Sequence, residues 1–241
     1  MFSAVEVEIN SNCNLKCSYC PNSIAERIEK GFMSKALYFD IISQLQEIGF
    51  SGRISYDFYN EPLLHPSISE YVAVAKNTLP KSSIEIYTNG TLLTLTKFKQ
   101  LVVAGVDKFV VTRHENTVDW EFEETYNLLT DQEKTLVVLR DHSELKLSNR
   151  GGLLKNIGPR TETTFLPCFI PEHIFTITVL GNVVPCFEDF HQYNSMGNLN
   201  EKKIIEIWNS EKYIQFRKDL KLGLRHKYKS CDQCNRHEVL F

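Results

Sequence analysis

The sequence predicts an α/β protein, built as a partial (β/α) barrel and followed by a smaller cysteine-rich domain. Over about the first 140 residues, short runs in which every second residue is apolar are separated by stretches of helical periodicity. That alternation is typical of parallel strands joined by right-handed helical crossovers. Further along, four cysteines surround a predicted hairpin. Five core strands are too few to close an eight-stranded barrel, so we expect a partial one with its chemistry at the carboxyl ends of the strands.

The expected strands of the barrel are short and mostly apolar. They cover residues 5–9, 54–59, 84–87, 109–112 and 136–139. Helices are expected between them. One begins at a Ser34 N-cap and reaches residue 48, one begins near Ser67, and two cover residues 93–103 and 122–129.

The sequence pattern of the C-terminal third differs from that of the barrel. Residues 145–166 are polar and rich in glycine, with Pro159 near their end, so they predict a connecting segment. A hairpin follows, with strands at 174–179 and 183–186 around Gly181-Asn182, and then helices at 203–208 and 211–222. The expected domains are residues 1–150 for the barrel, 151–167 for the bridge and 168–241 for the second domain.

Composition narrows the class of protein. The formal net charge of −3 argues against nonspecific binding to nucleic acid, which requires an excess of Lys and Arg. No apolar run approaches the ~20 residues that span a bilayer, and Glu6 and Glu8 interrupt any signal peptide. We therefore expect a cytoplasmic protein that binds neither membrane nor nucleic acid. In that compartment clustered cysteines indicate metal ligands or catalysts and not disulfides.

Three of the seven cysteines follow the first predicted strand, as Cys13, Cys17 and Cys20. Three thiolates on a [4Fe–4S] cluster leave one iron open, and an open iron can chelate the amino and carboxylate groups of a cofactor. The alternative is half of a zinc site, completed by His65 or His114.

The other four cysteines, Cys168, Cys186, Cys231 and Cys234, surround the predicted hairpin. Four thiolates complete the coordination of a [4Fe–4S] cluster or of a structural zinc ion. Their spacing alone does not separate the two.

The Cys-x3-Cys-x2-Cys loop resembles that of the radical S-adenosylmethionine (SAM) superfamily. The second set resembles the twitch domain, the short form of the SPASM extension, which binds an auxiliary [4Fe–4S] cluster. The resemblance implies that SAM binds the open iron of the first cluster, beside loops that follow successive strands. It assigns SAM contacts to Tyr19, Asn60, Glu61, Thr88, Asn89, Thr112 and Leu139.

Each of these SAM contacts has a plainer alternative. Tyr59-Asn60-Glu61 resembles the family's GGE motif, but both glycines are replaced, which puts the backbone geometry in question. Glu61 could be a solvated loop acid. Thr88-Asn89-Gly90 is ordinary turn chemistry in any protein.

Longer runs resemble a narrower family, the radical SAM dehydrogenases that oxidise 2-deoxy-scyllo-inosamine in aminoglycoside biosynthesis. These runs are residues 19–23, 58–64, 87–90, 141–143, 148–152 and 178–190. The resemblance implies that Tyr59, Tyr87, Arg150 and Glu188 face the substrate, with Arg150 the candidate catalytic contact. Alternatively, Arg150 forms a structural salt bridge and Glu188 is a solvated acid. Arg113 also lies at a predicted strand end, where an uncharged residue is expected, and its charge favours an acidic substrate.

That family implies a mechanism. A 5′-deoxyadenosyl radical abstracts hydrogen from a carbinol carbon of an amino-cyclitol or another polyol, and the auxiliary cluster accepts the second electron. The reductant would be a flavodoxin or a ferredoxin. No nicotinamide fingerprint is present to accept the electrons instead. The alternatives are a radical SAM enzyme that modifies a peptide or another sugar, and a zinc-binding adaptor. An epimerase would need a spare thiol, and all seven cysteines are assigned.

Overall fold

The computed structural model describes residues 1–115, 120–158 and 165–236. Pro159 and the C-terminal end of the second predicted domain, residues 237–241, lie outside the described residues. Within them, no helix is long and apolar enough to cross a membrane.

A single eight-stranded sheet forms the centre of the fold, in the order β5-β4-β3-β2-β1-β6-β7-β8. Strands β1 to β6 pair in parallel, and β7 and β8 pair antiparallel. The predicted hairpin therefore continues the barrel sheet, because β6 pairs with β1. The strands are β1 Ala4–Val7, β2 Arg53–Ser55, β3 Ser83–Thr88, β4 Lys108–Arg113, β5 Val137–Asp141, β6 Ile174–Ile177, β7 Asn182–Val184 and β8 Gly197–Asn198.

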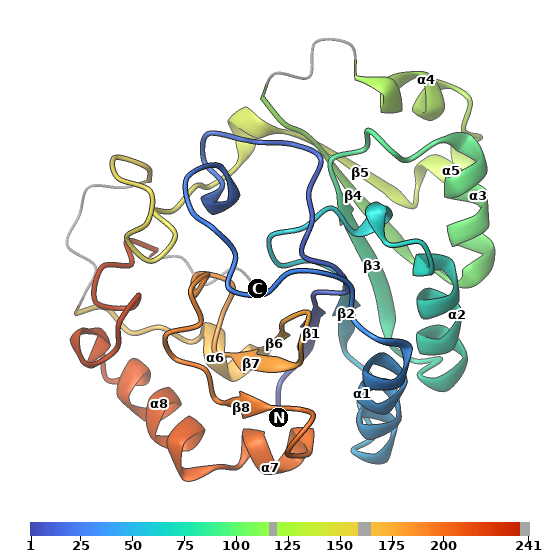
Figure 1. The fold of residues 1–241 in the computed structure, drawn as a ribbon. Helices are drawn as coiled ribbons and strands as arrows, with labels where there is room; N and C mark the ends of the chain where they lie inside the picture. The colour runs from blue at the N-terminus through green and yellow to red at the C-terminus, as the bar shows by residue number, and fades with distance from the viewer. Residues whose placement is uncertain (116–119, 159–164, 237–241) are drawn as a thin grey trace.

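Helices cover the outer face of this curved sheet. Figure 1 shows α1, α2 and α3 side by side along the right of β1 to β4, and α7 and α8 beside the C-terminal strands. The predicted α/β partial barrel is thereby confirmed. The helices are α1 Lys35–Glu47, α2 Ile68–Thr78, α3 Leu95–Ala104, α4 Glu121–Asn127, α5 Asp131–Lys134, α6 Ile170–His173, α7 Ile204–Trp208 and α8 Glu211–Lys221. Short 3-10 turns are η1 Pro21–Ser23, η2 Pro62–Leu64, η3 His142–Glu144 and η4 Arg225–Lys227.

The alternation of β1 separates an apolar side from a polar one. Val5 and Val7 are fully buried in the apolar core that the strands share with the helices. Glu6, between them, is on the opposite side and accepts a hydrogen bond from Thr176 on β6 at 2.9 Å. Ser55 on β2 pairs with Glu6 in register. The inner side of the partial barrel is therefore lined with polar groups, which suits it to bind polar ligands.

Two local expectations differ from the structure. The strand predicted at 54–59 ends at Ser55, because the Asn60 side chain accepts from the Phe58 amide and donates to the Tyr56 carbonyl, which folds the chain into a loop. Ser34 caps α1 as predicted, through a bond from the Leu37 amide. Ser67 occupies the cap position of α2 without a side-chain bond.

Candidate functional site

The first cysteine loop lies across the carboxyl ends of the strands. Contacts from distant segments hold it there: the Glu115 carboxylate accepts hydrogen bonds from the amide and the hydroxyl of Ser18, and Asn22 donates to the Tyr59 carbonyl. Burial raises the pKa of the Cys13 thiol to about 11 and that of Cys17 to about 12. Iron ligation requires thiolates, so the positive charge that ionises these cysteines must come from the iron itself.

Glu61 is buried and forms the centre of the predicted SAM-binding loops, and is not a solvated acid. Its carboxylate accepts from Thr88 Oγ at 2.8 Å, from the Asn89 amide at 2.9 Å and from the Leu63 amide at 3.0 Å. Burial raises its pKa to about 7, although these bonds lower it. Glu61 therefore fixes the end of β3 against the loop after β2, and three of the predicted SAM contacts form one hydrogen-bonded unit.

The loop that carries Tyr59 and Asn60 does not need the glycines of the family motif. The non-glycine residues with positive φ in the described chain are Arg150, Asn156, Gln192 and Ser230. Tyr59 and Asn60 are not among them, and the Asn60 side chain braces the loop. The altered motif therefore keeps an unstrained backbone.

The predicted adenine and ribose contacts are less closely grouped. Tyr19 is buried, with its hydroxyl 2.7 Å from His114 Nδ1 and its ring parallel to His142 at 6.4 Å. Thr112 is buried near the end of β4. Leu139 lies on the edge strand β5 and is 41% exposed, so its side chain is available for a flat ligand.

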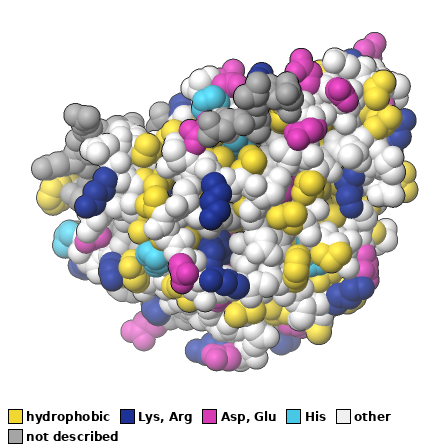
Figure 2. Space-filling view, turned by 45° about the horizontal axis from the view of Figure 1, so that its top comes forward, with side chains coloured by type: hydrophobic (Ala, Val, Ile, Leu, Met, Phe, Trp, Pro, Cys, Tyr) yellow, Lys and Arg dark blue, Asp and Glu magenta, His cyan; other side chains and the backbone are white. Residues whose placement is uncertain are grey.

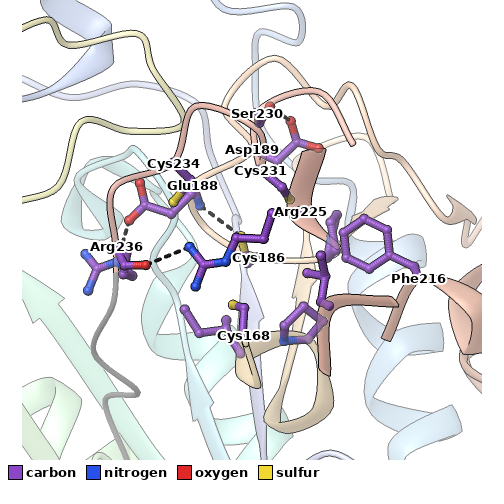
Figure 3. Close-up of a pocket in the computed structure, with 14 residues that line it drawn as sticks. Cys168, Cys186, Glu188, Asp189, Phe216, Arg225, Ser230, Cys231, Cys234 and Arg236 are labelled. Carbon is purple, nitrogen blue, oxygen red and sulfur yellow. Dashed lines mark hydrogen bonds and ion pairs between the residues drawn. The ribbon is translucent and has the colours of Figure 1, made fainter. Parts of the chain in front are cut away.

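The second set of cysteines lines one pocket. Cys168 precedes α6, Cys186 follows β7, and Cys231 and Cys234 lie in the turns after η4. Figure 3 shows Cys168, Cys186, Cys231 and Cys234 around the Arg225 side chain. Burial raises the pKa of all four thiols.

A buried ionic group joins the two cysteine sites. The Glu188 carboxylate accepts from Ser148 Oγ and from Arg236 Nε, both at 2.7 Å, and lies 3.5 Å from Arg150. Burial raises its pKa, but the two arginines outweigh that effect, and the pKa lies below its ordinary value. Glu188 is therefore an ionised, buried group, and the alternative of a solvated acid is wrong.

Arg150 faces both cysteine sets. Its guanidinium lies 5.7 Å from the centre of the Tyr59 ring, and Tyr59 donates a hydrogen bond to the carbonyl of Phe187, next to Cys186. Burial lowers the pKa of Arg150, but Glu188 and Tyr59, with smaller effects from Cys20 and Cys234, raise it above its ordinary value. Arg150 thus stays a cation and a hydrogen-bond donor. Its 3.5 Å ion pair with Glu188 matches the alternative of a structural bridge and also orients the side chain.

The backbone at Arg150 is held in a left-handed conformation, with φ of 49°, and Gly151 and Gly152 continue it. A Cβ at Gly151 would come within 2.9 Å of the Glu188 carbonyl, and one at Gly152 within 2.4 Å of Gln233 Oε1. A left-handed arginine costs about 1–2 kcal/mol and persists where its surroundings impose it. Close packing against the second cysteine loop imposes it here.

The remaining predicted substrate contacts lie apart from this group. The Tyr87 hydroxyl accepts from Arg53 at 2.9 Å and donates to Glu85 at 3.0 Å, on the inner side of the barrel. Arg113 is exposed at the end of β4, in register with Asp141, whose pKa it helps to lower. The carboxylate of Asp141 therefore lies near the unexpected positive charge of Arg113 and partly balances it.

A cavity of about 200 Å³ opens beside Arg150 and Glu188, with Tyr193, Lys229 and Gln233 among its other lining residues. Figure 2 shows the face on which the parallel strands end, with Lys and Arg side chains in and around a hollow near its middle. The site is thus open to a small polar molecule.

Three residues of the site were not identified from sequence: Ser148, Arg225 and Arg236. Ser148 lies within a run that matches the related family, and Arg236 follows Cys234 by two residues. Only these positions in the sequence could have indicated Ser148 and Arg236, because the residues they contact are distant in the chain.

Comparisons with known proteins agree with this architecture. Residues 7–129 match the model of the radical SAM superfamily, and residues 168–235 match the SPASM iron–sulfur cluster-binding domain. The S-adenosyl-L-methionine-dependent 2-deoxy-scyllo-inosamine dehydrogenase of Niallia circulans is 44% identical over 99% of this chain and 95% of its own.

Solved structures give the same result. The crystal structure of BtrN in complex with AdoMet and 2-DOIA has a TM-score of 0.93, at 44% identity over 98% of this chain and 94% of that one. The structure of BtrN in an open conformation has a TM-score of 0.80, at 38% identity over 98% of this chain and 93% of that one. The backbone of this chain is thus more similar to that of the complex with AdoMet and 2-DOIA.

Proposed function

Because the chain belongs to the radical SAM superfamily and carries a SPASM-type domain, we propose that it is a radical SAM dehydrogenase that oxidises a secondary alcohol of an amino-cyclitol. The substrate we propose resembles 2-deoxy-scyllo-inosamine. The relative that carries this name matches nearly the whole chain.

One observation carries the proposal. Within the described residues, Arg150 Nε and Glu188 Oε2 are both buried without a hydrogen-bond partner, although these side chains lie 3.5 Å apart at other atoms. An unsatisfied buried donor beside an unsatisfied buried acceptor costs about 1–3 kcal/mol for each group unless a ligand completes them. A polyol with an amino group supplies both kinds of partner.

The cofactors fit the residues that surround them. Cys13, Cys17 and Cys20 would hold the cluster with the open iron, and the other four cysteines would hold the auxiliary cluster. When bound, SAM and its cluster would supply a 5′-deoxyadenosyl radical, and the auxiliary cluster would provide an acceptor for the second electron.

The chain itself positions the substrate. Arg150 donates to a hydroxyl oxygen, Glu188 accepts from a hydroxyl or an ammonium, and Tyr59 packs against the guanidinium. The hydroxyl proton must leave during oxidation, and Arg150 is a poor base because its pKa is raised further above the neutral range. We place Arg150 as the contact that orients the reacting carbinol.

We also infer a cytoplasmic location, because reduced cysteines and clusters persist in a reducing compartment, and a flavodoxin or ferredoxin as the source of electrons. The direct test is to reconstitute the protein anaerobically and incubate it with SAM, a low-potential reductant and 2-deoxy-scyllo-inosamine. The expected result is 5′-deoxyadenosine together with a product two hydrogens lighter than the substrate. Formation of 5′-deoxyadenosine without an oxidised product would reject this substrate.

A further inference from the structure

Arg225 occupies an unusual position in the second cysteine pocket. The residue is 3% exposed and lines the pocket with Cys168, Cys186, Cys231 and Cys234. In Figure 3 its guanidinium lies among these cysteines. It is the first residue of η4, six residues before Cys231.

The hydrogen bonds of this guanidinium to the described residues all go to neutral backbone oxygens. Nε donates to the Leu166 carbonyl at 2.8 Å, Nη2 to the Pro167 carbonyl at 3.1 Å, and Nη1 to the Arg236 carbonyl at 2.8 Å. No carboxylate of the described residues lies within ion-pairing distance of it. The neighbouring arginines differ, because Arg150 and Arg236 share the Glu188 carboxylate.

A buried cation without a nearby anion is strongly unfavourable, because its hydration is lost with no Coulombic compensation. The cysteines that line the same pocket are groups that can carry negative charge, as thiolates. Four thiolates on a [4Fe–4S] core carry a net negative charge, which increases by one on reduction.

We infer that Arg225 is the counter-charge of the auxiliary cluster and raises its reduction potential, so that the cluster can accept an electron from the substrate. The inference rests on the proposed function, in that a cluster must occupy this pocket. Arg225 is a positioning residue here, because it acts on the cluster and does not touch the substrate.

The three carbonyl contacts add a second effect. Leu166 and Pro167 immediately precede Cys168, and Arg236 follows Cys234 by two residues. One guanidinium therefore ties together the two ends of the ligand set, which are more than 60 residues apart in the chain. The same side chain supplies charge and holds the ligands in place, so a test must separate these roles.

The experiment uses the full chain with Cys13, Cys17 and Cys20 changed to Ala, so that only the auxiliary cluster contributes to the spectrum. Iron and sulfide content and an EPR-monitored redox titration are measured for this protein and for three further changes. Arg225→Gln removes the charge, and Arg225→Lys keeps it but loses the planar fork. Lys227→Gln removes an exposed charge two residues away that pairs with Asp219 at 3.2 Å.

Arg225→Gln should make reduction at least about tenfold less favourable, a shift of about 59 mV to more negative potential for a one-electron couple. Arg225→Lys and Lys227→Gln should titrate close to the parent protein. Loss of iron in Arg225→Gln with retention in Arg225→Lys would also support the counter-charge.

An unchanged potential in a fully loaded Arg225→Gln variant would overturn the inference. Loss of iron in both Arg225 variants would also overturn it, because the carbonyl contacts alone would then explain the residue. If the parent protein itself binds no cluster at these cysteines, the proposed function fails instead, and the two failures are thereby distinguishable.

Discussion

The two cysteine sites are built in opposite ways. Cys13, Cys17 and Cys20 come from one continuous loop of eight residues, whereas Cys168, Cys186, Cys231 and Cys234 come from three separate segments. The buried carboxylates beside them differ too. Glu8 pairs with Arg27, seven residues beyond Cys20, and burial raises the pKa of Glu8 to about 7. Glu188 lies between two arginines at the second site, and its pKa is lowered.

This difference separates the tasks of the two sites. Three ligands from one loop leave an iron open for a cofactor. Four ligands from distant segments close the coordination sphere and fix the cluster beside Arg150 and Glu188. We therefore propose that the first site generates the radical, and that the second holds the substrate and accepts its electron.

The largest effects should come from removing one ligand at each site. Cys17→Ala should abolish 5′-deoxyadenosine formation altogether, because the cluster that cleaves SAM is lost. Cys186→Ala should retain slow SAM cleavage while ketone formation falls to background. Chromatography of both products in parallel reactions checks this. Equal loss of both activities in Cys186→Ala, with the first cluster intact by iron count, would contradict the division of tasks.

The substrate group should show the next largest effect. Glu188→Gln should lower kcat/KM by on the order of 100-fold, since a hydrogen bond to a charged group contributes about 1.5–3 kcal/mol. SAM cleavage without substrate should persist. Glu172→Gln is the matched control, because that acid pairs with Lys221 at 2.6 Å on the surface. A Glu188→Gln variant with the kinetics of this control would remove Glu188 from the site.

The two carboxylates should affect stability in opposite pH ranges. The raised pKa of Glu8 stabilises the fold below its ordinary pKa of 4.5, and this contribution, up to about 3 kcal/mol, is lost as pH rises through about 7. The lowered pKa of Glu188 contributes stability above pH 4.5 that is lost as pH falls through the folded value.

Urea unfolding across this range, with the clusters loaded, measures both contributions. Glu8→Gln should flatten the decline in stability between pH 4.5 and 7. Glu188→Gln should instead flatten the decline on the acid side. Parallel pH profiles for wild type and Glu8→Gln would show that Arg27 already keeps Glu8 ionised.

The smallest expected effect concerns the packing behind Arg150. Gly152→Ala should destabilise the protein by about 1–3 kcal/mol more than Gly49→Ala. Both glycines have positive φ, but only at Gly152 does the added carbon meet another side chain, 2.7 Å from Gln233 Cβ, which cannot rotate away. Denaturant midpoints compare the two. Equal losses of stability in the two variants would mean that the loop beside Arg150 moves aside without destabilising the protein.

Much of this arrangement could be predicted from local patterns. The alternation in residues 5–9 predicted β1, and the cysteine spacings marked both sites, because a motif on one loop is a local property. The pairing of β6 with β1 could not be predicted in the same way, since Ala4 and Ile174 are 170 residues apart. Glu188 was predicted, but its partners Ser148 and Arg236 were missed for the same reason. Ser148, Glu188 and Arg236 meet only after the C-terminal segment folds over the end of the barrel.

The account depends most on hydrogen abstraction from a carbinol carbon held between the two sites. The direct measurement uses 2-deoxy-scyllo-inosamine with deuterium at the carbon that is oxidised, and mass spectrometry of 5′-deoxyadenosine and the ketone. We expect 5′-deoxyadenosine one mass unit heavier than normal, in an amount equal to the ketone. Unlabelled 5′-deoxyadenosine formed without ketone would contradict the account.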